Sequence, residues 1–179
     1  MAGRPAPVLM RINANAHQGP TVKAISNHGS HAMYRNLFVP VDGSTLSLRA
    51  MAASIALAKQ LGAGITGFVV EPDAPMPMEG SPLPAYAEAT ENHIVRTDTH
   101  AHNILSRFEV MAAEAGVAFT GLHARTDGID RAIIEQAEES GCDMIVMMTH
   151  GRGTFGEWLF GSHTKNVLSK SKLPLLVLH

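Results

Sequence analysis

The feature that most constrains this chain is an alternation, from Asn36 onward, of short apolar runs with longer amphipathic segments. The runs are strand-sized, and the segments between them repeat apolar residues at helical spacing. This alternation predicts an α/β fold, a five-stranded parallel doubly wound open sheet with helices on both faces. We expect strands at 37–41, 65–70, 117–124, 144–148 and 175–178, and helices between 44 and 62 and at 85–115, 129–140 and 161–171.

Residues 1–32 differ from the rest of the chain. They contain no Asp or Glu, show neither helical nor strand periodicity, and are interrupted by proline and glycine. We expect a disordered tail or a start codon assigned too early, since Met33 immediately precedes the first strand. A basic arm with a binding role is the alternative. Residues 33–179 then form one domain, which is long enough for a sizeable core.

Composition excludes several classes of partner. The formal net charge is −2 and the pI is about 6.5, so no global basic field favours nucleic acid or an anionic membrane. The single cysteine, Cys142, excludes an intrachain disulfide framework and fits a reducing compartment. The apolar runs are far shorter than the roughly 20 residues that span a bilayer, and no secretory signal is seen. We therefore expect a cytoplasmic protein.

A glycine-bearing loop follows the apolar run 144–148. Gly151 lies in this loop, and Gly161 and Ser162 then begin a short helix. Glycine lets the backbone approach an anion, while free N–H groups and the helix dipole attract it. Asp42 ends the first strand, so it belongs to the same edge of the sheet as Gly151. The sequence predicts a phosphate site in a crevice at this edge.

These residues resemble a known family. The segment 39–44 (Val-Pro-Val-Asp-Gly-Ser), the spacing of Gly151 from Gly161-Ser162 and the closing segment 174–178 are similar to the universal stress protein family. The resemblance covers residues 34–179 and implies an adenine nucleotide alpha hydrolase-like fold. In the ATP-binding branch of the family the motif reads Gly-x-x-Gly-x9-Gly-(Ser/Thr), a spacing more specific than a lone glycine pair.

The resemblance implies a role for five residues. Asp42 would contact the ribose or adenine, and Val69 would present its backbone to the adenine. Gly151, Gly161 and Ser162 would hold the phosphates. Each polar or glycine residue also has a structural explanation, because Asp42 and Ser162 suit helix caps and Gly151 suits a left-handed turn.

One position departs from the family motif. Met148 stands where the ATP-binding branch has its first glycine. Its side chain would either crowd the ribose and phosphates of a nucleotide or lean away and leave the site intact. The orientation of the Met148 side chain therefore decides between two functions, a nucleotide-binding protein and a nucleotide-free one.

The sequence offers little for catalysis or metal binding. It has no Gly-x-Ser-x-Gly elbow, no P-loop, and no carboxylate cluster for Mg²⁺ beyond Asp42. His100 and His102 are two residues apart on an expected helix, so they point to different faces and suit a metal poorly. His150 and His163 are better placed, near any bound phosphates. We expect neither an enzyme nor a metal site.

Together, the residues and the resemblance predict a stress-response binding and signalling module that binds adenine nucleotide, with ATP as the expected cofactor. We expect a homodimer through the last strand, 175–178, because an apolar edge strand needs a cover. The main alternative is a nucleotide-free dimeric interaction protein of the same fold, with Met148 filling the site. A third is an adenylyl-handling enzyme.

Overall fold

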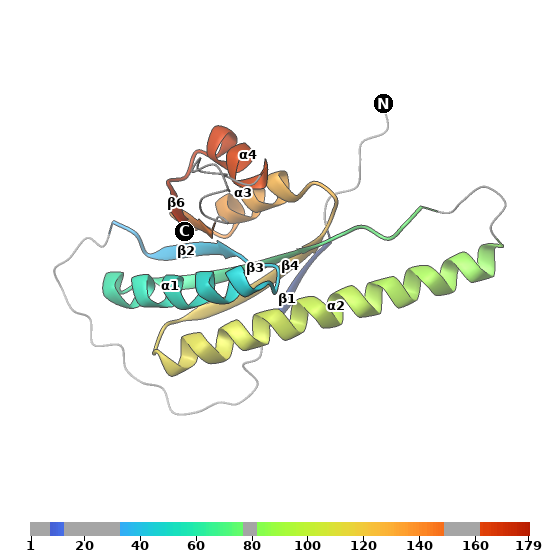
Figure 1. The fold of residues 1–179 in the computed structure, drawn as a ribbon, viewed down its shortest axis with the longest axis horizontal. Coiled ribbons are helices and arrows are strands. Elements are labelled where there is room, and N and C mark those ends of the chain that lie inside the picture. Colours follow the sequence, from blue (N-terminus) through green and yellow to red (C-terminus); the bar gives the residue numbers. More distant parts are fainter. Residues whose placement is uncertain (1–7, 13–32, 77–81, 149–161) are drawn as a thin grey trace, which may run out of the picture.

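The computed structural model describes residues 8–12, 33–76, 82–148 and 162–179. Its strands form one six-stranded sheet in the order β1-β4-β3-β2-β5-β6, flanked by four helices (Figure 1). Along the chain, the described elements are β1 (Val8–Ile12), β2 (Asn36–Pro40), α1 (Thr45–Leu61), β3 (Gly64–Glu71), α2 (Leu83–Glu114), β4 (Phe119–Arg125), α3 (Ile129–Glu139), β5 (Met144–Met148), α4 (Ser162–Lys170) and β6 (Leu175–Leu178).

Strands β2 to β6 confirm the predicted fold class. They are all parallel, and each pair of sequential strands is joined through a helix. β2 lies in the middle, with β3 and β4 on one side and β5 and β6 on the other. The strand order therefore reverses between β2 and β5. In sheets of this kind, that switch point opens a crevice beyond the carboxyl ends of the strands.

One of the six strands, the edge strand β1, was not expected. The sequence predicts no strand in residues 1–32, but Val8–Ile12 pairs antiparallel with β4, from Val8 opposite Arg125 to Ile12 opposite Gly121. Without β1, the outer edge of β4 would present unpaired backbone N–H and C=O groups. The run is only five residues long and its partner is far away in the sequence, so periodicity does not reveal it. The other residues of 1–32 lie outside the described part of the chain.

Helices cover both faces of the sheet. Successive strand residues point to opposite faces, so Val69 packs in a core with Met51 of α1 and Phe108 of α2. Its neighbour Phe68 packs in a second core on the other face, with Ile133 of α3. Burying such large apolar side chains stabilises the fold by about 1.5–3 kcal/mol each. The two cores hold the ends of β2, β3 and β5 in fixed positions around the switch point.

The helix that follows β2 begins at a defined cap. Ser44 is the N-cap residue of α1, and its Oγ accepts a hydrogen bond from the backbone N–H of Ser47 at 3.2 Å. This bond satisfies one of the free N–H groups of the first turn. The turn between β2 and α1 is thereby fixed beside the crevice.

Candidate functional site

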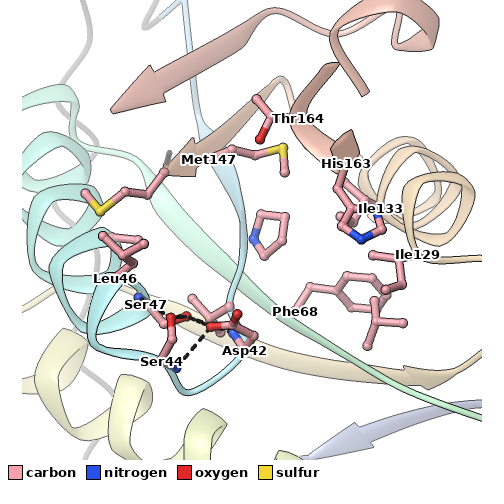
Figure 2. Close-up of a pocket in the computed structure, with 15 residues that line it drawn as sticks. Asp42, Ser44, Leu46, Ser47, Phe68, Ile129, Ile133, Met147, His163 and Thr164 are labelled. Carbon is pink, nitrogen blue, oxygen red and sulfur yellow. Dashed lines mark hydrogen bonds between the residues drawn. The ribbon is translucent and has the colours of Figure 1, made fainter. Parts of the chain in front are cut away.

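A cavity of about 320 Å³ lies at the switch point. It is bounded by the ends of β2, β3 and β5 and by the starts of α1, α3 and α4, and Figure 2 shows Asp42 on one side of it and His163 on the other. Its size is within the range of ligand pockets, roughly 300–1,000 Å³. Among the described residues that line it, most are apolar, and the polar ones are Asp42, Ser44, Ser47, His163 and Thr164.

The first polar wall, which we name the β2–α1 wall, consists of Asp42, Ser44 and Ser47. The backbone N–H of Asp42 donates to Ser47 Oγ at 2.8 Å, and that hydroxyl donates in turn to Asp42 Oδ1 (Figure 2). The backbone N–H of Ser44 donates to the same carboxylate oxygen at 3.0 Å. Ser47 is buried, so these bonds hold the carboxylate in one orientation.

The charge of Asp42 follows from this network. Partial burial by itself would raise the pKa of the carboxyl group, but the hydrogen bonds from Ser47 and Ser44 outweigh it and lower the pKa below its ordinary value of 3.8. Asp42 is therefore a carboxylate at neutral pH. Within the described residues its hydrogen bonds all go to Oδ1. Oδ2 is thus open to a hydroxyl or amino donor of a ligand.

Gly43 fixes the turn that carries Asp42. Its φ is +78°, a left-handed conformation that favours glycine. A Cβ at this position would lie 2.9 Å from Ile104 Cδ1, so the end of the Ile104 side chain on α2 would have to shift. The close packing of the turn on α2 positions the carboxylate at the mouth of the cavity.

The second polar group, which we name the α3–α4 wall, consists of His163, which lines the cavity, together with Asp130 and Asn166, which do not. His163 Nδ1 lies 2.5 Å from Asp130 Oδ1, and Asn166 Nδ2 donates to Asp130 Oδ2 at 2.5 Å. Asp130 belongs to the first turn of α3, where the helix dipole favours a negative charge. His163 belongs to the first turn of α4 and lines the cavity. The contact between Asp130 and His163 therefore links the N-terminus of α3 to that of α4 beside the cavity.

The structure brings together only some of the residues expected from the sequence. Asp42 and Met148 both line the cavity, Met148 as the half-buried last residue of β5. Ser162 is the exposed first residue of α4, next to His163. Gly151 and Gly161 lie outside the described residues.

Val69 lies apart from this group. Its side chain is in the core beneath α1 and α2, and its neighbours Phe68 and Val70 line the cavity. Its backbone role with adenine remains a prediction.

Sequence reasoning missed Ser47 and Asp130. Ser47 had a local signal, because it lies three residues after the N-cap Ser44 and five after Asp42. Asp130 had none, because its partner His163 is 33 residues further along the chain. Only the packing of α4 on α3 joins them.

No group of three or more His, Cys, Asp or Glu side chains is arranged to hold a metal ion in the described part of the chain. His100 instead pairs with the buried Glu71, with 2.6 Å between Nδ1 and Oε1. No helix among these residues is long and apolar enough to cross a membrane.

The fold and the cavity define a doubly wound α/β protein of the adenine nucleotide alpha hydrolase-like type, with a ligand-sized crevice at its switch point. A family model described as the universal stress protein family matches residues 33–179. The chain belongs to the universal stress protein family.

Individual relatives agree with this assignment. A universal stress protein of Methanocaldococcus jannaschii is 29% identical over 150 residues, which cover 81% of this chain and 82% of that protein. The solved structure of a universal stress protein in complex with cAMP has a TM-score of 0.55 and 24% identity, covering 82% of this chain and 97% of the other. That of a universal stress protein from Archaeoglobus fulgidus in complex with dAMP has a TM-score of 0.52 and 17% identity, covering 82% and 99%.

Proposed function

We propose that this protein binds an adenine nucleotide, ATP foremost, in the cavity at the switch point, and that it acts as a stress-response binding and signalling module. The observation that carries the proposal is the Asp42 carboxylate, held by Ser44 and Ser47 at the rim of a largely apolar cavity. Such a site suits a ligand with an apolar face and hydroxyl or amino donors, as an adenine nucleoside has. The complexes of two fold relatives with cAMP and dAMP support the same ligand class.

Each part of the nucleotide has a candidate contact. Oδ2 of Asp42 would accept a hydrogen bond from the ribose or adenine, and the base would lie against Phe68 and the backbone near Val69. The phosphates would lie toward the start of α4, where Ser162 is exposed, with Gly151 and Gly161 in the preceding segment. α4 has no acidic residue of its own in its first turn, and the positive end of its dipole favours an anion.

The proposal is for binding rather than turnover. A site that holds phosphates without a positioned base and metal ligands binds nucleotide far better than it hydrolyses it. In the described part of the cavity Asp42 is the single carboxylate, and its Oδ1 is engaged by Ser44 and Ser47. We therefore propose a non-enzymatic role. As expected from the sequence, we place this role in the cytoplasm.

A homodimer through β6 belongs to the same proposal. β6 lies at the edge of the sheet, and each of its four apolar residues, Leu175–Leu178, is only partly buried. A second copy of the chain would cover this edge and its apolar side chains.

The test is calorimetric titration with ATP. Asp42→Asn keeps the shape of the side chain but removes its charge, and should weaken ATP binding by about tenfold, or roughly 1.4 kcal/mol. Asp73→Asn is the matched control, because this exposed carboxylate does not line the cavity. Equal affinity in wild type and Asp42→Asn would remove the proposed role of the carboxylate.

Met148 favours the competing function, a nucleotide-free interaction protein, because it lines the cavity at the end of β5. Replacing it with glycine opens space there. If Met148 obstructs the site, Met148→Gly should tighten ATP binding by about tenfold. Failure of both the wild type and Met148→Gly to bind ATP at roughly millimolar concentration, a free energy of only about −4 kcal/mol, would favour the nucleotide-free function.

A further inference from the structure

We propose that His163, oriented by Asp130, is the cationic contact for the phosphates of the bound nucleotide. This inference rests on the proposed function and adds to it a residue that selects phosphorylated ligands over nucleosides. It follows from three observations: the charge distribution around the cavity, the orientation of the imidazole, and the neutralisation of Asp130.

The charge distribution is asymmetric. Among the described residues that line the cavity, His163 is the one side chain that can carry a positive charge, and Asp42 is the one that carries a negative charge. They stand on opposite sides of the space (Figure 2). A ligand with hydroxyl or amino donors at one end and an anionic group at the other matches this arrangement.

The imidazole is oriented by its contact with Asp130. Nδ1 lies at hydrogen-bond distance from Asp130 Oδ1, which leaves Nε2 for a ligand. No hydrogen bond of Nε2 is found within the described residues. Asp130 cannot turn freely, because Asn166 donates to its other oxygen. When the ring is protonated, Nδ1–H donates to Asp130 and Nε2–H is a fixed donor for a phosphate oxygen.

Asp130 also gives the histidine a second role. Without the imidazole, this carboxylate would keep a full negative charge beside the start of α4 and repel a phosphate group there. An imidazolium next to it neutralises that charge, and the N-terminus of α3 stabilises it further. His163 therefore removes a repulsion and supplies a donor.

Phosphate binding through His163 depends on its protonation, because only the imidazolium carries a positive charge and donates from both ring nitrogens. The groups that face His163 within the described part of the chain are Asp130 and Asn166, with Asp42 across the cavity. The lowered pKa of Asp42 keeps it ionised at pH values well above its ordinary value of 3.8, so it adds no pH dependence near neutral pH. A gain in phosphate affinity at lower pH is the signature of His163.

The experiment compares wild type with His163→Gln by calorimetry at about pH 6 and about pH 8, using ATP and adenosine. ATP itself titrates in this range, so the measured quantity is the ratio of wild-type to variant affinity at each pH. We expect a ratio of about ten for ATP at the lower pH, about 1.4 kcal/mol, falling toward one at the higher pH. For adenosine, which has no phosphate, the ratio should be close to one at both.

The double variant His163→Gln/Asp130→Asn separates contact from screening. If His163 donates to the phosphates, the double variant should remain weak; recovery of wild-type affinity would show that His163 only masks Asp130 and would overturn the contact. ATP ratios of one at both pH values, with the wild type binding ATP, would overturn this inference alone. A wild type that binds neither ATP nor adenosine would overturn the proposed function as well. Circular dichroism checks that each variant is folded.

Discussion

The two polar walls of the cavity are built in different ways. The β2–α1 wall lies within six consecutive residues, 42–47, and its hydrogen bonds run among Asp42, Ser44 and the buried Ser47. The α3–α4 wall joins Asp130 to residues 33 and 36 positions further along the chain, and the His163 side chain is 53% exposed. A local network built around the buried Ser47 hydroxyl should be costly to disturb. A long-range, exposed one should cost little in stability and respond to pH and ligand.

The largest effect on stability is expected at Gly43 in the β2–α1 wall. Gly43→Ala adds a Cβ to a left-handed residue and drives it against Ile104, so we expect a loss of about 2–4 kcal/mol. Gly62→Ala is the matched control, since Gly62 has a similar φ of +66° but no atom within 4 Å of the added Cβ. It should cost only about 1–2 kcal/mol. Urea unfolding measures both, and equal losses would show that contact with α2 does not hold the turn.

The second effect is expected at Ser47. Ser47→Ala removes the hydroxyl that accepts from the backbone N–H of Asp42 and donates to its carboxylate. Leaving partly buried groups without a partner should cost about 1–3 kcal/mol. The exposed Ser169, whose hydroxyl donates only to a carbonyl of its own helix, is the control, and Ser169→Ala should change the unfolding free energy by less than about 0.5 kcal/mol. A Ser47→Ala variant as stable as wild type would contradict the idea of a rigid wall.

The contrast between the walls also explains what the sequence could predict. The five parallel strands and their helices were predictable because hydrophobic periodicity is a local signal. Asp42 was predictable because it ends a strand and precedes a cap, both visible in the segment 39–44. The strand β1 was not, since five residues without helical or strand periodicity acquire a role only beside the edge of β4.

The α3–α4 wall could not be predicted from local sequence patterns for the same reason. His163 was expected near phosphates because it follows Ser162, but nothing near Asp130 marks it as the partner. The side chains that pair there meet only because α3 and α4 cover the same face of the sheet (Figure 1). The face of the sheet to which Val69 points was not predicted either, because it depends on the register of β3.

A smaller effect is expected in the α3–α4 wall. Asp130→Asn removes the carboxylate that holds His163 and Asn166, but His163 is half exposed and solvent screens the pair, so the cost should be about 0.5–1 kcal/mol. A double-mutant cycle with His163→Gln isolates the pair from other losses. A coupling above about 2 kcal/mol would mean that this wall is as rigid as the other and would break the comparison.

The smallest effect concerns the pH dependence of stability at Asp42. The pKa of Asp42 is lower in the folded state than its ordinary value of 3.8. The contribution of Asp42 to folding stability is therefore complete at a pH above 3.8 and is lost as the pH falls through the lower pKa of the folded state. The carboxylate is exposed enough for solvent to reduce the effect. Urea unfolding between about pH 7 and pH 3 should therefore show a slightly steeper acid loss for wild type than for Asp42→Asn. Ser47→Ala, which removes the strongest hydrogen bond to this carboxylate, should shift its titration, followed by NMR, upward. Identical acid profiles in all three proteins would mean that the serine hydroxyls do not set the charge of the β2–α1 wall.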